Sequence, residues 1–599
     1  METKEIHISQ GQNLSHIMPD GIPSNTILNK TICGIGATTL EIISQRHSII
    51  VEPNVPVIKG KEKKHRTVLG VYEGIKKDRI IDYVNNCKGF CKIMTTPESF
   101  YRVKRALYET RLILRKDFFI LFDECEKIVQ DVDYRSRISL PMKDFFLAKN
   151  KAMVSATPLL PSDPRFEEQN FTIIKVIPDF DYKKKLSLLQ TNNVYSLLDI
   201  VLREIPEDRK VCIFFNSTSG ITKLIDKMEI GEESIIYCSQ EATSRLRNHS
   251  YNAYDTLQIE SGFVKLTKYT FLTSRFFSAV DIDLEEKDKP IVIILTELYS
   301  APHSLIDPFT ETIQILGRFR NGIQKGIHII NNREDIEVMS DDELAGFLKG
   351  EHKIYEALYL TKEKSSDTGE LAILDQALKS VDYSRFVDQD CHINHFMYDN
   401  AYNGEHTKAL YKEYDAIYDA YISAGAFKVD WKKLTLRFTD KQREYISKSE
   451  ISKESLNKYA FSIIRDLINR NNKYDKCQLE ELSESVGTLI EAFEVLGTDK
   501  IIEIGFKDRD LKAAIASAKS FELENSIGVR QAVYTHFREF AWYSSREITS
   551  KLEEIYNAFN IKVDGRGISN KITLYFDARK ENHSDKRGWK LERALHSVK

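Results

Sequence analysis

Short apolar runs dominate the pattern of the chain from about residue 26 to about residue 330. They alternate with helical spacings of apolar residues, which is typical of βα units and parallel sheets. The runs are rich in β-branched and aromatic residues and are too short for ordinary helices. The predicted strands are SIIVEP, CKIMTT, FFILFDE and KAMVSAT, followed by VCIFFNS, SIIYCS, YTFLTS, PIVIILTE and GIHIIN.

A polar segment, PDFDYKKK (Pro178 to Lys185), separates the first four predicted strands from the other five. Each set is large enough to form its own sheet covered by helices. The pattern therefore predicts an α/β protein with two tandem lobes, residues 1–180 and 181–340.

After about residue 340 the strand pattern fades, and long charged helical patterns replace it. Two of them are DDELAGFLKGEHKIYEALYLTKEK and KQREYISKSEISKESLNKYAFSIIRDLINRN. Charge runs of this kind are most often solvated helix faces. Residues 341–540 are therefore predicted to be a mainly helical accessory region.

The last segment, residues 541–599, has a different pattern. Ser544 and Glu547 form a capping box, and one helical face then carries Ile548, Leu552, Ile555, Tyr556 and Phe559. The stretch DGRG ends that helix, and the apolar KITLYF precedes a basic segment that contains a turn. The segment holds 12 Lys and Arg against 8 Asp and Glu. It fits either a C-terminal winged helix or a small basic module used for packing or protein contacts.

Composition narrows the class of protein. A chain of 599 residues is too long for one hydrophobic core, and 42% hydrophobic with 29% charged residues is ordinary for a soluble protein. The formal net charge of -3 excludes a uniformly basic nucleic-acid coat but allows a local basic groove. No signal peptide and no run of about 20 apolar residues is found, which predicts a cytoplasmic location.

The eight cysteines are scattered and do not form a disulfide framework. Cys391, His392 and His395 could suggest a zinc site, but no second ligand pair at a suitable spacing accompanies them. A helix-surface or core cluster is the alternative interpretation.

The stretch LNKTICGIGATTLEIIS has the pattern of a phosphate-binding loop. Gly34 and Gly36 precede a helix predicted to begin near Thr38, so backbone N–H groups could face a phosphate. Thr38 is placed to offer its hydroxyl to Mg²⁺. A glycine-rich turn before a helix is, however, often only a turn.

The stretch FFILFDECEK predicts a buried strand with Asp123 and Glu124 at its carboxyl end, where open α/β sheets bind ligands. Asp123 would hold Mg²⁺, directly or through water, and Glu124 would orient and deprotonate an attacking water. An acidic pair also commonly ends a strand for solubility.

Taken in order, these motifs resemble those of the superfamily 2 helicases, the DEAD/DEAH-box-like nucleic-acid-dependent ATPases, over roughly residues 26–335. The matching stretches are GIGATT, VEPN, TTPES, FDECE, SATP, FFNST, TSRFFSAVDI and QILGRFRN. The resemblance implies two RecA-like lobes, ATP and Mg²⁺ as ligands, and single- or double-stranded nucleic acid as partner, with DNA favoured. The compact last motif is similar to that of viral origin-binding and mobile-element helicases. This resemblance implies a role in replication, contacts with replication proteins, and a source in a prokaryotic or virus-infected cell.

The resemblance also assigns roles to residues. Gln314, Arg318 and Arg320 would face the γ-phosphate, with one of the two arginines acting as the arginine finger, and Ser155 and Thr157 would couple the nucleotide site to the strand-binding face. The nucleotide itself would be bound by Lys30, Gly34, Gly36, Ala37, Thr38, Thr39 and Asp281. The nucleic-acid backbone would be bound by Thr96, Pro97, Glu98, Asn216, Ser217 and Thr273. In the seventh motif Ala279 replaces the glycine of the family.

The loop departs from the family at Ala37, where the family has its phosphate-binding lysine. Two explanations stay open. Lys30 could reach the same oxygens from the N-terminal side of the loop, as in the deviant loops of some viral packaging ATPases, because lysine is a flexible point charge. Alternatively, the chain is a non-hydrolysing nucleic-acid-binding or replication scaffold. Retention of the acidic pair and of both arginines favours an active helicase or translocase. A third interpretation is a motor subunit of a defence complex, although residues 340–599 show no nuclease pattern.

Overall fold

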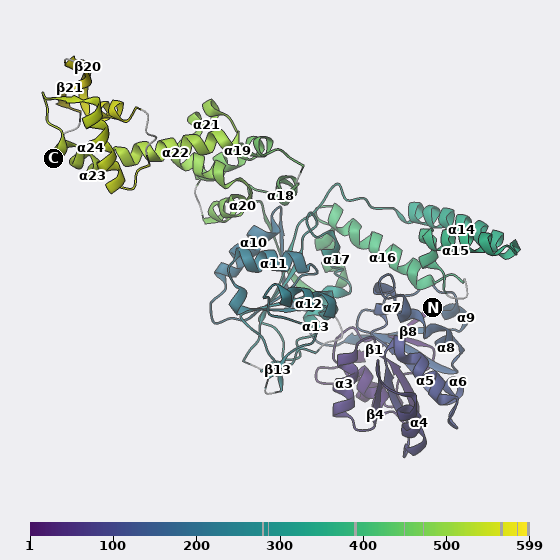
Figure 1. Ribbon diagram of the computed structural model, residues 1–599. Helices are drawn as coiled ribbons and strands as arrows, with labels where there is room; N and C mark the ends of the chain where they lie inside the picture. The colour runs from purple at the N-terminus through teal and green to yellow at the C-terminus, as the bar shows by residue number, and fades with distance from the viewer. Residues whose placement is uncertain are drawn as a thin grey trace. The chain divides into compact units, whose positions relative to one another are not determined.

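The computed structural model describes residues 1–260, 262–277, 281–285, 287–388, 392–448, 450–470, 473–562, 567–583 and 585–595. Ala279, Cys391 and most of the stretch DGRG lie outside the described residues. The chain divides into two units, Met1–Leu436 and Arg437–Lys599 (Figure 1). Among the described residues, no helix has the length and apolar character needed to cross a membrane.

The first lobe is built on an eight-stranded sheet in the order β1-β8-β2-β7-β6-β3-β5-β4, in which every neighbouring pair is parallel. The strands are β1 (Glu2–Ile8), β2 (Thr26–Asn29), β3 (His47–Val51), β4 (Val68–Val71), β5 (Lys92–Thr95), β6 (Phe118–Asp123), β7 (Asn150–Ser155) and β8 (Thr172–Pro178). The helices are α1 (Leu14–Ile17), α2 (Ala37–Ile43), α3 (Val55–Lys64), α4 (Lys77–Asn86), α5 (Phe100–Leu107), α6 (Leu114–Asp117), α7 (Glu126–Gln130), α8 (Met142–Leu147) and α9 (Arg165–Glu168). Central strands alternate their side chains between two apolar cores, so both faces of the sheet are buried.

The second lobe has another eight-stranded parallel sheet, in the order β12-β11-β15-β10-β16-β17-β9-β18. Its strands are β9 (Lys184–Thr191), β10 (Val211–Phe214), β11 (Ser234–Tyr237), β12 (Ala253–Tyr254), β15 (Tyr269–Leu272), β16 (Ile291–Thr296), β17 (Lys325–Ile330) and β18 (Phe427–Leu434). The helices are α10 (Val194–Glu204), α11 (Thr218–Lys227), α12 (Gln240–Asn248) and α13 (Glu311–Gly317). A small antiparallel hairpin joins β13 (Ile259–Glu260) to β14 (Phe263–Val264).

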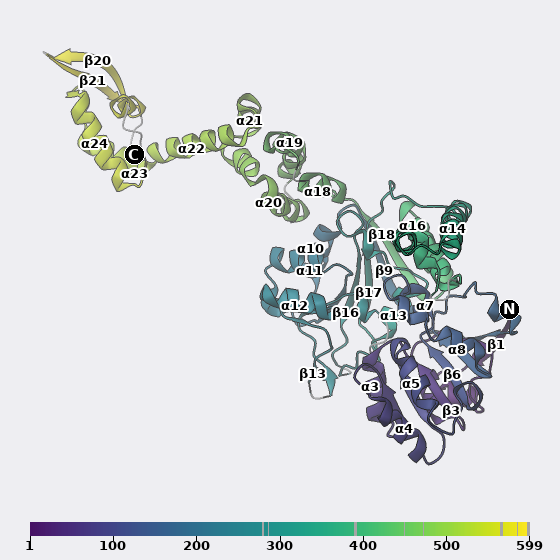
Figure 2. The same cartoon turned by 45° about the vertical axis from the view of Figure 1, so that its right-hand side comes forward.

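The predicted α/β class with two tandem parallel-sheet lobes is confirmed, and all nine predicted strands are present. The change from the first sheet to the second falls between Pro178 and Lys184, within the predicted linker. One strand, β18, lies where only helices were predicted. It pairs with β9 at the edge of the second sheet (Figure 2), and most of its side chains are exposed, which hides it among charged residues.

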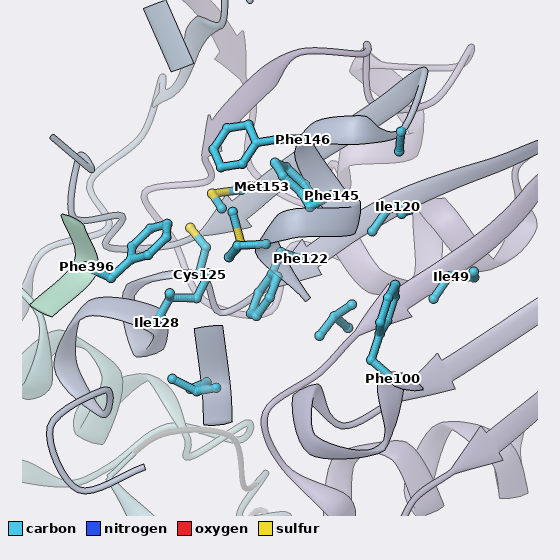
Figure 3. Packing of buried hydrophobic residues seen from close by; sticks show 14 of the residues in the cluster. Ile49, Phe100, Ile120, Phe122, Cys125, Ile128, Phe145, Phe146, Met153 and Phe396 are labelled. Atoms are coloured by element: carbon cyan, nitrogen blue, oxygen red, sulfur yellow. The ribbon is translucent and has the colours of Figure 1, made fainter. Parts of the chain in front are cut away.

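The segment between β17 and β18 packs on both lobes. Its helices are α14 (Asp341–Lys364), α15 (Thr368–Ser380), α16 (His395–Lys412) and α17 (Ala416–Ala424). At the start of α16, Phe396 lies in the core of the first lobe near Cys125 and Met153 (Figure 3). At its end, Tyr411 lies in a core of the second lobe. Helix α16 therefore joins the two lobes by packing as well as by covalent connection.

The unit Arg437–Lys599 has two cores of its own. The first is formed by α18 (Asp440–Ser447), α19 (Lys453–Arg470), α20 (Lys473–Val495), α21 (Thr498–Ile504) and α22 (Asp508–Glu524). The second lies among α23 (Ile527–His536), α24 (Ser545–Ala558), the 3-10 helix η7 (Ile568–Leu574) and a sheet of β19 (Trp542–Ser544), β21 (Lys586–Ala594) and β20 (Phe576–His583). The capping box of Ser544 and Glu547 begins α24 as predicted, whereas Phe559 follows the helix and is 42% exposed.

Candidate functional site

The loop between β2 and α2 has the backbone expected of a phosphate-binding loop. Gly34 and Gly36 have φ angles of 84° and 91°, in the left-handed region that favours glycine. Leu14 N–H donates to the carbonyl of Ile35 at 3.0 Å, and Lys30 N–H donates to the carbonyl of Ser155 at 2.8 Å. These bonds fasten the loop to α1 and to the end of β7. The short helix α2 then begins at Ala37.

Thr38 and Asp123 meet beside this loop. Thr38 Oγ1 donates to Asp123 Oδ2 at 2.6 Å, and both side chains present oxygen, the ligand that Mg²⁺ prefers. The two residues therefore fit a Mg²⁺ ion that also takes phosphate oxygens or water. Within the described ranges, no group of three or more His, Cys, Asp and Glu side chains could hold a metal ion alone.

Lys30 reaches the same place from the end of β2. It is 5% exposed, and its Nζ lies 3.2 Å from Glu124 Oε1 and 3.8 Å from Asp123 Oδ1. Burial alone would lower the pKa of Lys30, but the two carboxylates outweigh burial and raise it. Lys30 is thus a buried, charged lysine beside the acidic pair Asp123 and Glu124.

Gln314, in α13, and Arg318, directly after that helix, approach Glu124 from the second lobe. Gln314 Nε2 donates to Glu124 Oε2 at 3.2 Å, and Arg318 Nη2 lies 3.6 Å from Glu124 Oε1. Arg318 also donates to Gln314 Oε1, which fixes the two side chains together. Burial would raise the pKa of Glu124, yet Lys30 and Arg318 together lower it to about 2. Glu124 is therefore held as a carboxylate between cations of both lobes.

Arg320 lies over the loop itself. It forms an ion pair with Asp281, and a Cβ on Gly34 would lie 2.1 Å from Arg320 Nη1. The loop touches α13 as well, because a Cβ on Gly317 would lie 2.5 Å from Cys33 Sγ. Glycine at both positions permits the close approach of the two lobes at this loop.

Thr157 and a residue that was not predicted, Glu126, join this network through Gln314, and Ser155 joins it through Thr157. Gln314 Nε2 donates to Glu126 Oε1 and to Thr157 Oγ1, both at 3.1 Å, and Thr157 N–H donates to Ser155 Oγ at 2.9 Å. Burial and the neighbouring Glu124 charge raise the pKa of Glu126 to about 8. The side chain lies in the quoted stretch FDECE, so its position next to the acidic pair was the available signal.

Apart from this network, a cavity of about 860 Å³ is lined by residues of both lobes. The predicted residues Asn216, Ser217 and Thr273 line it, together with Arg245 and Arg275, which were not predicted. Ser217 and Ser239 cap α11 and α12 by accepting backbone N–H groups, so the amino ends of both helices face this cavity. Hydroxyls, helix amino ends and arginines are the groups that bind phosphodiester oxygens.

The other three predicted strand contacts lie differently. Thr96 is 5% exposed, and neither it nor Pro97 lines that cavity. Glu98 forms an ion pair with Arg135 at 2.5 Å, and Arg135 does line it. The structure therefore brings Glu98 to the edge of the cavity only through Arg135.

The remaining predicted residues fall as follows. Ala37 is buried, and Thr39 accepts a hydrogen bond from Lys61 Nζ at 3.1 Å. Lys61 was not predicted, since no motif or spacing in the sequence ties α3 to the loop. His392 and His395 border a separate cavity of about 990 Å³, while Cys391 lies outside the described residues.

No family model matches the chain, and a search of curated proteins found no match. Among solved structures, the chain is similar to Dbp5 of S. cerevisiae bound to RNA and ADP BeF3, at 15% identity over 53% of this chain and 82% of that one, with a TM-score of 0.35. It is also similar to a DEAD box protein from Methanococcus jannaschii, at 12% identity, 59% and 86% coverage and a TM-score of 0.28. RecG bound to a three-way DNA junction matches at 12% identity, 64% and 47% coverage and a TM-score of 0.32.

Proposed function

We propose that the chain is a nucleic-acid-dependent ATPase that works as a helicase or translocase. One observation carries the proposal: one largely buried network joins the first lobe to the second, with Lys30, Thr38, Asp123 and Glu124 from the first and Gln314 and Arg318 from the second. Such a network lets a ligand at the phosphate loop control the distance between the lobes. A dead site has no physical need to hold a carboxylate and an arginine across that boundary.

Each side chain has a task in this proposal. Thr38 and Asp123 hold Mg²⁺, which neutralises charge on the phosphates when it is bound. Glu124 orients the attacking water and accepts its proton, and Arg318 or Arg320 stabilises the charge that develops on the γ-phosphate. Gln314 couples the site to Glu126 and Thr157, next to Ser155, through its hydrogen bonds to both.

Lys30 replaces the lysine that is missing at position 37. In the structure its charge is balanced by Glu124 and Asp123. Binding of a triphosphate draws the ammonium toward phosphate oxygens, because these carry more negative charge. Loss of that neighbour raises the pKa of Glu124 from about 2 toward the range in which a carboxylate is an effective base.

The cavity that Asn216, Ser217 and Thr273 line is the proposed path of a single strand. The second unit is proposed to add duplex contacts. Its order of α23, β19, α24, η7 and the hairpin of β20 and β21 supports a winged helix, and the hairpin exposes Arg579, Lys580, Lys586 and Arg587. A role in replicating a mobile element or virus, and a preference for DNA, stay predictions from the motif resemblance.

Steady-state ATP hydrolysis tests the proposal, measured with and without single-stranded DNA and RNA for wild type, Lys30→Ala and Glu124→Gln. We expect turnover that nucleic acid stimulates, and its loss in both variants. Glu124→Gln keeps ATP binding because the amide preserves shape and removes only the base. The surface variant Glu168→Gln serves as the matched control.

A second function, a non-hydrolysing scaffold, is favoured by one observation: Ala37 removes the lysine and Lys30 is already paired with carboxylates. Wild type would then bind single strands without hydrolysing ATP under any of these conditions. Undiminished hydrolysis in Glu124→Gln would instead show that the base has been assigned wrongly.

A further inference from the structure

A second lysine approaches the phosphate loop from α3. Lys61 lies in the last turn of α3, is half-buried, and donates from Nζ to Thr39 Oγ1 at 3.1 Å. Thr39 stands two positions after Ala37, in the first turn of α2. The ammonium of Lys61 is thus held at the loop by a neutral acceptor that belongs to the loop's own helix.

The charges around Lys61 come from both lobes. Burial lowers its pKa, and Lys64 and Arg320 act in the same direction, whereas Asp123 and Asp281 act against it. Asp123 belongs to the first lobe and Asp281 to the second. Among the described residues, however, no carboxylate lies within 4.0 Å of Lys61 Nζ, so the half-buried ammonium has attraction at a distance but no ion pair.

We propose that Lys61 binds a phosphate oxygen of the nucleoside triphosphate, and that Lys61 and Lys30 together replace the lysine absent at position 37. This inference rests on the proposed ATPase function. Lysine carries its charge on a flexible four-carbon stem, so Nζ can leave the Thr39 hydroxyl for a nearby phosphate oxygen with little movement of α3.

Lys30 and Lys61 have different surroundings, and different roles follow from them. Lys30 is paired with the carboxylates that handle Mg²⁺ and water, whereas Lys61 is bound to a hydroxyl. A half-buried charge without an opposite partner is unfavourable, and a phosphate supplies that partner. Binding energy at Lys61 is therefore available to the ligand, since no existing ion pair must be broken.

Two other lysines of α3, Lys59 and Lys63, differ from Lys61 in their surroundings. Lys59 Nζ lies 5.1 Å above the ring of Tyr72, which gives it a structural role. Lys63, two positions after Lys61, is exposed. Lys63→Met thus removes the same charge from the same helix without touching the loop, and is a matched control.

The experiment uses the full-length protein and measures the Kd of ATP and of ADP in the presence of Mg²⁺, and the Tm without nucleotide. Lys61→Met keeps the stem and removes the charge. We expect it to weaken ATP binding by about 10-fold to 100-fold, the range of a charge-assisted hydrogen bond, with Tm nearly unchanged. Lys61→Arg should retain most of the affinity, and Lys63→Met should match wild type.

The outcomes separate the two proposals. If wild type binds Mg-ATP and Lys61→Met binds it equally well, the inference is overturned while the proposed function stands. If affinity and Tm fall together in Lys61→Met and Lys61→Arg restores neither, Lys61 is a packing residue, which also overturns the inference. Wild type that binds no Mg-ATP would remove the proposed function and the inference with it.

Discussion

At the residue scale, the lack of a Cβ at Gly34 allows Arg320 to lie against the loop. Alanine at Gly34 would carry the strain of a φ of 84° and would place its Cβ on Arg320. Alanine at Gly74, with a φ of 89°, has nothing within 4 Å. We expect both variants to lose about 1 kcal/mol of stability from backbone strain, and only Gly34→Ala to lose ATP binding.

Chemical denaturation and ATP titration of the two glycine variants check this prediction. Equal loss of ATP affinity in Gly34→Ala and Gly74→Ala would show that strain, and not displacement of Arg320, determines the effect.

Glu126 gives a prediction about pH. Its pKa is raised from 4.5 to about 8 in the folded chain, so between these values the unfolded chain releases a proton that the folded chain keeps. Stability from this group is therefore present below pH 4.5 and is lost as pH rises toward 8. Glu126→Gln, which resembles the protonated acid, should reduce the fall of Tm between pH 5 and pH 8.

Melting curves of wild type, Glu126→Gln and the exposed-site control Glu168→Gln at pH 5, 6, 7 and 8 measure this slope. A Glu126→Gln slope identical to that of wild type would mean that Glu126 is ionised in the folded chain.

Much of the candidate site could be predicted because its residues follow buried strands. Asp123 ends β6 and Ser155 ends β7, two adjacent predicted strands, so the parallel sheet brings them to one edge. Lys61 and Arg245 could not be predicted, because they sit on helix surfaces and reach their sites only through the tertiary packing. Sequence spacing also gives no sign that Thr96 is buried.

At the element scale, α16 is anchored in both lobes. Phe396 is 3% exposed in the core of the first lobe, and Asn400 Nδ2 donates to the carbonyl of Val129 in α7 at 2.8 Å. Phe396→Ala should destabilise the first unit by about 3–5 kcal/mol, because it leaves a cavity in that core. Ile373→Ala on α15, where the side chain is 70% exposed, should change stability by less than about 0.5 kcal/mol.

Urea unfolding monitored in both variants tests this expectation. A small effect of Phe396→Ala would mean that the helical segment is not part of the folded core of the first lobe.

The strands that could be predicted are those whose side chains are apolar on both faces, such as β6 and β16. The strands that were missed include β8 and β9, which contain lysines and flank the polar linker, as well as short strands and edge strands. β2 and β4 are only four residues long, and β1 and β18 are edge strands with many exposed polar side chains. The spacing and number of apolar residues identify a strand from the sequence only where both faces of that strand are buried.

At the scale of the whole molecule, the two units have separate cores. A fragment of residues 1–436 should therefore fold and keep the proposed ATP binding, since every residue of the proposed nucleotide site lies in it. A fragment of residues 1–340 removes α16 and β18, exposes apolar residues of both lobes, and should be less stable or insoluble.

Calorimetry and ATP titration of the two fragments check the prediction. Equal stability of both fragments would show that the helical segment contributes nothing to the lobes.

The packing of α16 also changes what happens when the backbone is cut. The chain passes from the first lobe to the second between Pro178 and Lys184, returns to the first lobe with α14, and reaches the second again along α16. A protease that nicks the segment between β8 and β9 would leave two polypeptides, yet Leu344 and Phe396 of the larger piece would still be buried in the smaller. The protein is thus suited to reconstitution from these two pieces expressed separately. Their reassembly would measure how strongly the helical segment packs on the first lobe.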